Sequence, residues 1–109
     1  MKGIVLITGA TAGIGSATAL LFAKNKYNVI ITGRRLERLK SLENQINNNY
    51  ETKVLSLNFD IREYNEVKKH IDNLPYEWKN IDILINNAGL ASGFGPIDQG
   101  DIEDWNKML

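Results

Sequence analysis

Residues 8–15 read Thr-Gly-Ala-Thr-Ala-Gly-Ile-Gly and separate an apolar run from an alanine-rich segment. The run before them, Gly3–Ile7, is typical of a buried parallel strand. The Ala- and Leu-rich residues 16–23 favour a helix. Several larger residues of that helix are predicted to share one face, namely Ile14, Thr18, Leu21 and Phe22. The glycines are therefore expected in a tight turn from strand to helix.

Each glycine of this turn has a separate physical use. Gly9 can adopt the positive φ that a sharp exit from a strand often needs. Gly13 lacks a Cβ atom, so backbone N–H groups can close on a pyrophosphate at the helix N-terminus. Gly15 lets the helix lie close to its strand, and Ala10 and Ala12 keep the rest of the turn small. A tight turn that binds no ligand would satisfy the same pattern.

Composition limits the class of protein. The chain has 109 residues, 13 basic and 13 acidic side chains and 43% apolar residues, which suits one soluble globular unit. Zero net charge gives no reason to expect nucleic acid or a membrane surface as a partner. Cysteine is absent, so disulfides and thiolate chemistry are excluded within this sequence, and a cytoplasmic location is predicted.

Strand and helix patterns alternate along the rest of the chain. They are predicted in the order strand 27–32, helix 34–46, strand 52–59, helix 61–73, strand 81–85, loop 90–100 and a helix from Asp101 to Leu109. The apolar stripes expected to face the core are Leu36, Leu39, Leu42 and Ile46 in one helix and Val67 and Ile71 in the next. This alternation predicts an α/β fold, a Rossmann-type doubly wound parallel sheet with strand order 3-2-1-4. Residues 1–109 are expected to form one portion of a single domain.

A polar cluster follows each predicted strand. Residues 9–15 follow the first, Arg34-Arg35 the second, Asp60 the third and Asn86–Gly89 the fourth. Because ligands of open α/β sheets bind at the carboxyl ends of the strands, one extended ligand could contact all four clusters.

The two arginines bear on the choice of cofactor. An NAD-binding turn is typically followed, about 20 residues later, by an acidic residue for the ribose 2′-hydroxyl. Here Arg34 and Arg35 stand at that place, and guanidinium groups match a phosphate, which favours NADP, with Arg34 as the principal contact. Ordinary surface arginines at a helix start are the alternative.

Asp60 has two interpretations that are compatible. Its carboxylate could accept a hydrogen bond from the adenine amino group, with the Ile61 backbone N–H at a ring nitrogen. The sequence Asp-Ile-Arg-Glu from Asp60 to Glu63 also has the form of a capping box, with Asp60 as N-cap of the following helix.

The two consecutive asparagines need partners if they end a buried strand, because an unpaired buried amide costs about 1–3 kcal/mol. Asn87 is expected to reach a ribose, and Asn86 to connect neighbouring strands. Ala88 and Gly89 leave room for the sugar and the nicotinamide. An Asn-rich turn without a ligand is the alternative.

The predicted cofactor contacts are Gly9, Ala10, Thr11, Ala12, Gly13, Ile14, Gly15, Arg34, Arg35, Asp60, Ile61, Asn87, Ala88 and Gly89. His70 is expected at a solvated surface position, and the aromatic residues Tyr76, Trp78 and Trp105 are expected to pack. No group of acidic residues and histidine has the spacing of a metal site.

Two motifs of the sequence resemble those of the short-chain dehydrogenase/reductase family. They are Thr8-Gly9-x-x-x-Gly13-x-Gly15 and Asn86-Asn87-Ala88-Gly89. Gly33-Arg34-Arg35 resembles the NADP-preferring members. Residues 33–39, 74–78 and 80–90 are similar to bacterial NADP-dependent 3-hydroxy acid dehydrogenases, also described as serine dehydrogenases. That likeness implies oxidation of a small 3-hydroxy acid or serine, a cytoplasmic location and a homotetramer.

The resemblance also bears on catalysis. In the family, a Tyr, a Lys, a Ser and an Asn form the proton relay, and all four follow the fourth strand. Tyr50, Tyr64 and Tyr76 do not belong to a Tyr-x-x-x-Lys pattern at the right place, which in the family follows the fourth strand, so no catalytic residue is assigned in this sequence. We expect the chain to be the cofactor-binding portion of an oxidoreductase, inactive by itself.

Two other functions fit parts of the pattern. A non-catalytic dinucleotide-binding or redox-sensing module would need the same turn and the same arginines. A nucleotide-sugar or S-adenosylmethionine binder would need the turn but no 2′-phosphate site, and the paired arginines argue against it.

Overall fold

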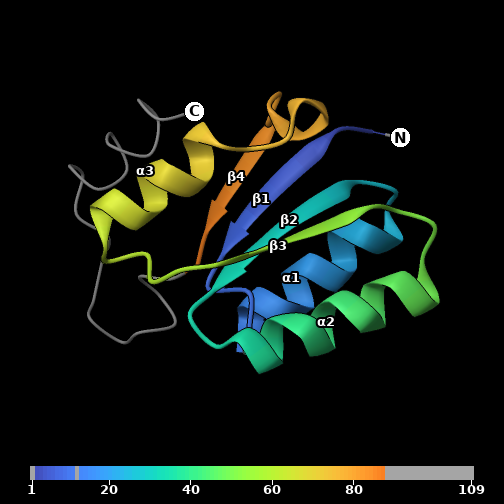
Figure 1. Cartoon of the computed structure of the whole chain (residues 1–109). Coiled ribbons are helices and arrows are strands. Elements are labelled where there is room, and N and C mark those ends of the chain that lie inside the picture. The colour runs from blue at the N-terminus through green and yellow to red at the C-terminus, as the bar shows by residue number, and fades with distance from the viewer. Residues whose placement is uncertain (1, 12, 88–109) are drawn as a thin grey trace.

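The computed structural model of the chain describes residues 2–11 and 13–87 (Figure 1). The strands are β1 (Ile4–Thr8), β2 (Asn28–Gly33), β3 (Val54–Asn58) and β4 (Ile83–Asn86). The helices are α1 (Gly13–Lys24), α2 (Leu36–Asn49) and α3 (Tyr64–Asp72), with a 3₁₀ turn, η1, at Tyr76–Trp78. The predictions for Ala12, Ala88, Gly89, the loop 90–100 and the helix from Asp101, with Trp105, lie outside the described residues.

The four strands form one parallel sheet in the order β3-β2-β1-β4, which confirms the predicted topology. At the centre, Ile7 of β1 pairs with Ile31 of β2 on one side and with Ile85 of β4 on the other. The strands are shorter than predicted at some ends. At β4, for example, the Asp82 carboxylate accepts a hydrogen bond from the Ile4 backbone N–H (2.9 Å), before regular pairing starts at Ile83.

Helices cover both faces of the sheet, with α1 and α2 on one face and α3 on the other (Figure 1). Every residue of β1 is buried, and its side chains alternate between the two layers. Val5 and Ile7 belong to the cluster under α1 and α2, whereas Ile4 and Leu6 belong to the cluster under α3. The doubly covered sheet explains why β1 reads as a continuous apolar run rather than as an alternating one.

Helix α1 contacts the sheet mainly through its small residues. Its buried residues are the small ones, Gly15, Ala19 and Ala23, whereas Ile14 is 72% and Leu21 57% exposed. Phe22 is half-buried and packs against the cluster under α1 and α2, so the four residues predicted to share one face do not share one environment. The helix also begins at Gly13, so the glycine turn supplies its first residues.

The other helices follow their predicted stripes with one exception. Leu39, Leu42 and Ile46 of α2 are buried as predicted, but Leu36, in the first turn of α2, remains about half exposed. Val67 and Ile71 of α3 are buried, which confirms that stripe.

The aromatic residues after α3 divide between core and solvent. Trp78 is buried in the layer under α3, as predicted, whereas Tyr76 is 89% exposed, so its predicted packing role is wrong. Both belong to η1, and this short turn directs only Trp78 toward the core. His70 of α3 is half-buried rather than fully solvated, with its ring 5.1 Å from the ring of Phe59.

Within residues 2–11 and 13–87, no helix combines the length and the apolar character that crossing a membrane requires.

The packing of α1 predicts whether a substitution at Gly15 raises or lowers the stability of the chain. A Cβ atom at this position would collide with the Gly9 carbonyl oxygen. Helix propensity alone predicts that Gly15→Ala stabilises the chain by about 1 kcal/mol. We expect instead a loss of about 1–3 kcal/mol in the free energy of unfolding, the usual cost of overpacking. Urea denaturation measures the difference, with Ser16→Ala as the control on the neighbouring position. Equal or greater stability of Gly15→Ala would refute the close contact.

Candidate functional site

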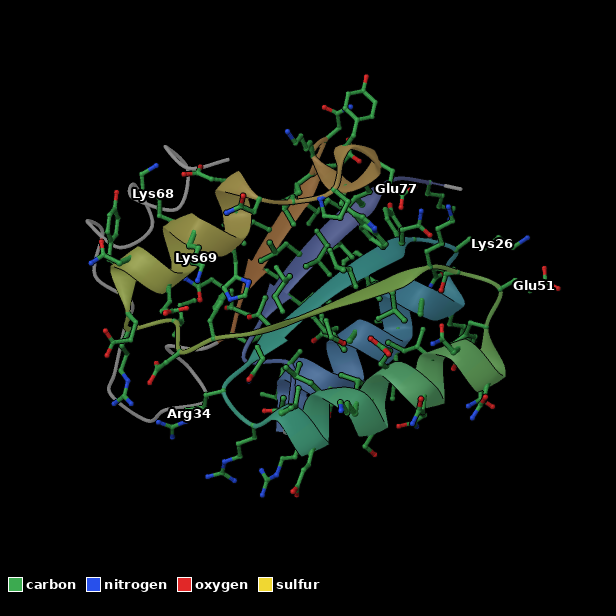
Figure 2. All side chains as sticks on the ribbon, in the orientation of Figure 1. Lys26, Arg34, Glu51, Lys68, Lys69 and Glu77 are labelled. Carbon is green, nitrogen blue, oxygen red and sulfur yellow. The ribbon has the colours of Figure 1, made fainter. Side chains whose placement is uncertain are left out.

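The carboxyl ends of the four strands lie along one edge of the sheet because all four run in the same direction. Thr8 at the end of β1 pairs with Asn86 at the end of β4, and Gly33 at the end of β2 pairs with Asn58 at the end of β3. Figure 2 shows Arg34 at this edge and Lys26 and Glu51 at the opposite end of the molecule. The segments that follow the strands therefore meet as predicted.

The β1–α1 turn depends on its glycines. Gly9 and Gly13 both have positive φ, at 60° and 53°, a conformation that side chains with a Cβ atom rarely adopt. The turn is fixed to the neighbouring strand by the Ala10 backbone N–H, which donates to the Thr32 carbonyl oxygen (3.0 Å). Ala10 is fully buried, so this part of the turn supports the structure from within.

The outer side of the turn is open. A Cβ atom added to Gly13 would meet nothing within 4 Å, in contrast to the crowded position of Gly15. Gly13 also starts α1, and no acidic residue lies in the first turn of that helix. The unpaired N–H groups of a helix N-terminus carry partial positive charge, so an anion is favoured at this place.

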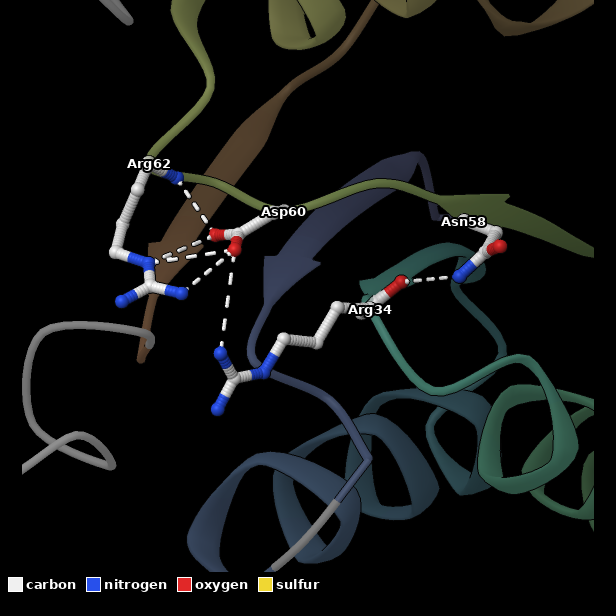
Figure 3. A network of polar contacts seen from close by, with 5 residues as sticks. Arg34, Asn58, Asp60 and Arg62 are labelled. Carbon is white, nitrogen blue, oxygen red and sulfur yellow. Dashed lines mark hydrogen bonds and ion pairs between the residues drawn. The ribbon is translucent and has the colours of Figure 1, made fainter.

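Asn58 connects the ends of β2 and β3 and fixes the backbone before Arg34. The Gly33 carbonyl oxygen accepts hydrogen bonds from the Asn58 side-chain amide (2.9 Å) and the Phe59 backbone N–H (3.1 Å). Arg34 extends from this point toward Asp60, with 3.9 Å between its Nη1 and Asp60 Oδ2 (Figure 3). Its side chain is 59% exposed, and Arg35 is exposed as well. The structure thus brings Arg34 and Asp60 together.

Asp60 is not the N-cap of α3, so the predicted capping box is wrong. The helix begins at Tyr64, and Glu63 occupies the N-cap position without a side-chain capping bond. Asp60 closes a separate turn instead, in which its Oδ1 accepts from the Arg62 backbone N–H (3.0 Å) and its carbonyl oxygen accepts from the Glu63 N–H (2.9 Å). An acidic residue readily makes this local turn, and the turn delays the start of the helix by three residues. Ile61, within it, is half-buried.

The Asp60 carboxylate is held mainly by Arg62. The Arg62 guanidinium donates to both carboxylate oxygens, with Nη2–Oδ2 at 2.8 Å and Nε–Oδ1 at 3.1 Å (Figure 3). These side-chain bonds, assisted by the Arg62 backbone N–H and by the charge of Arg34, lower the pKa of Asp60 from 3.8 to about 2. No role was predicted for Arg62 from the sequence, because the predicted capping box involves Asp60 and Glu63.

The two asparagines after β4 behave differently. Asn86 Oδ1 accepts a hydrogen bond from Thr8 Oγ1 (2.6 Å), which confirms the prediction that Asn86 connects neighbouring strands. Asn87 is buried at 6% exposure, and its Nδ2 has no hydrogen-bond partner among the described residues. A buried amide without a partner is unfavourable, so this position is suited to a ligand that supplies an acceptor.

The described members of the predicted site follow the four strands at one edge of the sheet: the β1–α1 turn, Arg34, Arg35, Asp60, Ile61 and Asn87. Asn58 and Arg62 are additions that sequence reasoning missed. An asparagine at the end of a strand and an arginine two residues after an aspartate are the signals that could have identified them. No group of three acidic or histidine side chains that could hold a metal ion occurs in the described part of the chain.

Comparison with known proteins gives a consistent result. Residues 3–109 match the model of the short chain dehydrogenases. The chain is 43% identical over 106 residues to the NADP-dependent 3-hydroxy acid dehydrogenase of Salmonella typhi, covering 97% of this chain and 41% of that protein. It is 44% identical over 109 residues to serine 3-dehydrogenase of Rhizobium radiobacter, covering all of this chain and 42% of that protein.

Solved structures agree. The crystal structure of serine dehydrogenase from Escherichia coli matches with a TM-score of 0.73 and 42% identity, over 96% of this chain and 47% of that one. The closed form of a serine dehydrogenase complexed with NADP+ matches with a TM-score of 0.68 and 40% identity, over 74% and 31% of the two chains. The chain spans about two-fifths of the length of the curated relatives.

The Asp60–Arg62 contact predicts a measurable titration. In Arg62→Ala we expect the pKa of Asp60 to rise from about 2 toward 3.8, because the guanidinium that stabilises the carboxylate is gone. The folded-state pKa lies below the unfolded one, so the charged carboxylate stabilises the fold above about pH 4, and this contribution is lost as the pH falls through about 2. Carboxyl ¹³C NMR titration measures the pKa, with Lys68→Ala as the control. A pKa that stays near 2 in Arg62→Ala would contradict the assignment.

Proposed function

Because the chain belongs to the short chain dehydrogenase family, we propose that it forms the NADP-binding portion of an oxidoreductase of that family. The main support is the buried Asn87 amide nitrogen, which lacks a partner among the described residues, at the edge where all four strands end. A ribose hydroxyl placed against Asn87 would supply the missing acceptor. When bound, the nicotinamide of the cofactor gives or takes a hydride at a substrate carbon.

The described part of the β1–α1 turn fits the diphosphate. Gly13 faces open space at the start of α1, so the backbone can approach a ligand closely without a side chain in between. The helix N-terminus favours the negative charge of a diphosphate. Gly15 plays no direct part in binding in this proposal; it allows α1 to lie close enough for the turn to keep its shape.

Arg34 supports NADP rather than NAD. The position after β2 carries an exposed guanidinium at the place where NAD-binding sheets typically carry an acid. A 2′-phosphate can accept two parallel hydrogen bonds from a guanidinium. Asp60 is near, but its charge is balanced by Arg62 and Arg34, which reduces its repulsion of the phosphate. Relatives and neighbouring structures named for NADP or NADPH give independent support.

We assign to the whole protein the reversible oxidation of the alcohol of a small hydroxy acid, such as a 3-hydroxy acid or serine. This assignment draws on the names of the relatives, and no described residue is given a catalytic role. A cytoplasmic location and a homotetramer belong to the same proposal.

Cofactor titration tests the assignment of NADP. We expect NADPH to bind more tightly than NADH by at least about tenfold, since a charge-assisted contact to phosphate contributes roughly 1.5–3 kcal/mol. Arg34→Ala should remove most of this difference by weakening NADPH alone. Isothermal calorimetry or nicotinamide fluorescence measures both affinities. Lys40→Ala, an exposed cation on α2, is the matched control for net charge. Equal affinities of the unaltered chain for the two cofactors would refute the proposal.

Asn87→Ala should separate stability from binding. Removing a buried amide whose nitrogen has no partner among the described residues is expected to leave the melting temperature of the cofactor-free protein unchanged or slightly raised. The same change should weaken NADPH and NADH equally, by about three- to tenfold, because a hydrogen bond to a ligand is lost. Calorimetry of unfolding and of binding measures the two effects, with the exposed Asn47→Ala as control. A destabilised protein with unchanged cofactor affinity would show that Asn87 has only a structural role.

A further inference from the structure

We propose that Arg62 is a positioning residue that sets cofactor preference: by engaging the Asp60 carboxylate, it leaves the Arg34 guanidinium available for the 2′-phosphate. The inference rests on the proposed binding of NADP. It assigns to Arg62 a role that acts through Asp60 rather than through contact with the ligand.

The geometry shows an unequal competition for one carboxylate. Arg62 reaches Asp60 with three donors, namely its backbone N–H (3.0 Å), Nε (3.1 Å) and Nη2 (2.8 Å). Arg34 approaches the same Oδ2 only to 3.9 Å, beyond hydrogen-bond distance. A carboxylate offers about four acceptor sites, so Arg62 occupies most of them. Arg34 is attracted by the charge but keeps its own donors for a ligand.

The local chain explains why Arg62 has the advantage. It lies two residues after Asp60 in a turn closed by the Arg62 and Glu63 backbone N–H groups, so little chain entropy is lost when its side chain folds back. Arg34 comes from the end of a different strand, and Figure 3 shows the two guanidinium groups approaching Asp60 from different segments.

Removal of Arg62 would reverse this arrangement. Both arginine side chains are more than half exposed, at 59% for Arg34 and 63% for Arg62, so Arg34 can rotate without disturbing the core. Asp60 would then accept hydrogen bonds from the Arg34 guanidinium, and a 2′-phosphate would have to displace that ion pair. NADH carries no 2′-phosphate, so its affinity does not depend on where the Arg34 guanidinium lies.

A double-mutant cycle tests the inference, with the ratio of NADPH to NADH affinity as the readout. We expect Arg62→Ala to lower the ratio about threefold, within the range of an exposed ion pair. In an Asp60→Ala background, where Arg34 has no competing carboxylate, Arg62→Ala should leave the ratio unchanged. A change in the adenine site alters the affinities of NADPH and NADH by the same factor, so it leaves their ratio unaltered.

The matched control is Lys68→Ala. It removes one positive charge and an equally short ion pair, to Asp72 at 2.7 Å, from the adjacent helix (Figure 2), and it should leave the ratio unaltered. Thermal melts by circular dichroism, together with the NADH affinity, verify that each variant is folded.

Three results have distinct meanings. A ratio unchanged by Arg62→Ala in the unaltered background overturns the inference but not the proposed function. An equal fall of the ratio in both backgrounds also overturns it, because Arg62 would then contact the phosphate directly. Absence of any preference for NADPH in the unaltered chain refutes the proposed function itself.

Discussion

Parallel pairing of β1 with both β2 and β4 is the constraint on which the rest of the structure depends. It directs the carboxyl ends of all four strands to one edge, so residues far apart in sequence become neighbours there. It also forces helical connections that cover both faces of the sheet. The central strand then has no solvated side, which accounts for its complete burial and its unbroken apolar sequence.

The close approach of α1 to the β1–α1 turn extends this constraint to the candidate binding site. Gly15 lies directly against the Gly9 carbonyl oxygen, and Ala19 and Ala23 continue the small-residue contact along the helix. The position of the helix fixes where its N-terminal N–H groups lie, and therefore where an anion is favoured. One consequence is that Ile14 and Leu21 face away from the core and remain exposed.

Two kinds of polar group meet at this edge, and they differ in how far the protein itself satisfies them. The Thr8–Asn86 hydrogen bond and the Asp60–Arg62 ion pair are complete within the chain, and they hold β4 and the turn after β3 in place. The Asn87 amide nitrogen has no partner among the described residues, and Arg34 is held by charge alone at 3.9 Å. The first kind stabilises the scaffold. The second kind marks the places where a contact with a ligand contributes most to the binding free energy, because binding there replaces no strong internal contact.

The sequence by itself determined the order of strands and helices, the parallel sheet and the edge at which the polar segments after the strands lie. These features depend on apolar periodicity and on glycine spacing, which are local properties of residues such as Gly9, Gly13 and the run from Ile4 to Ile7. Only the tertiary structure decided which face of α1 is buried, because the separation of helix and sheet favours Gly15 and Ala19 over larger side chains. It also decided the partner of Asp60. A capping box and a local turn use the same residues, and in the folded chain Asp60 accepts from the Arg62 and Glu63 backbone N–H groups, so α3 starts only at Tyr64.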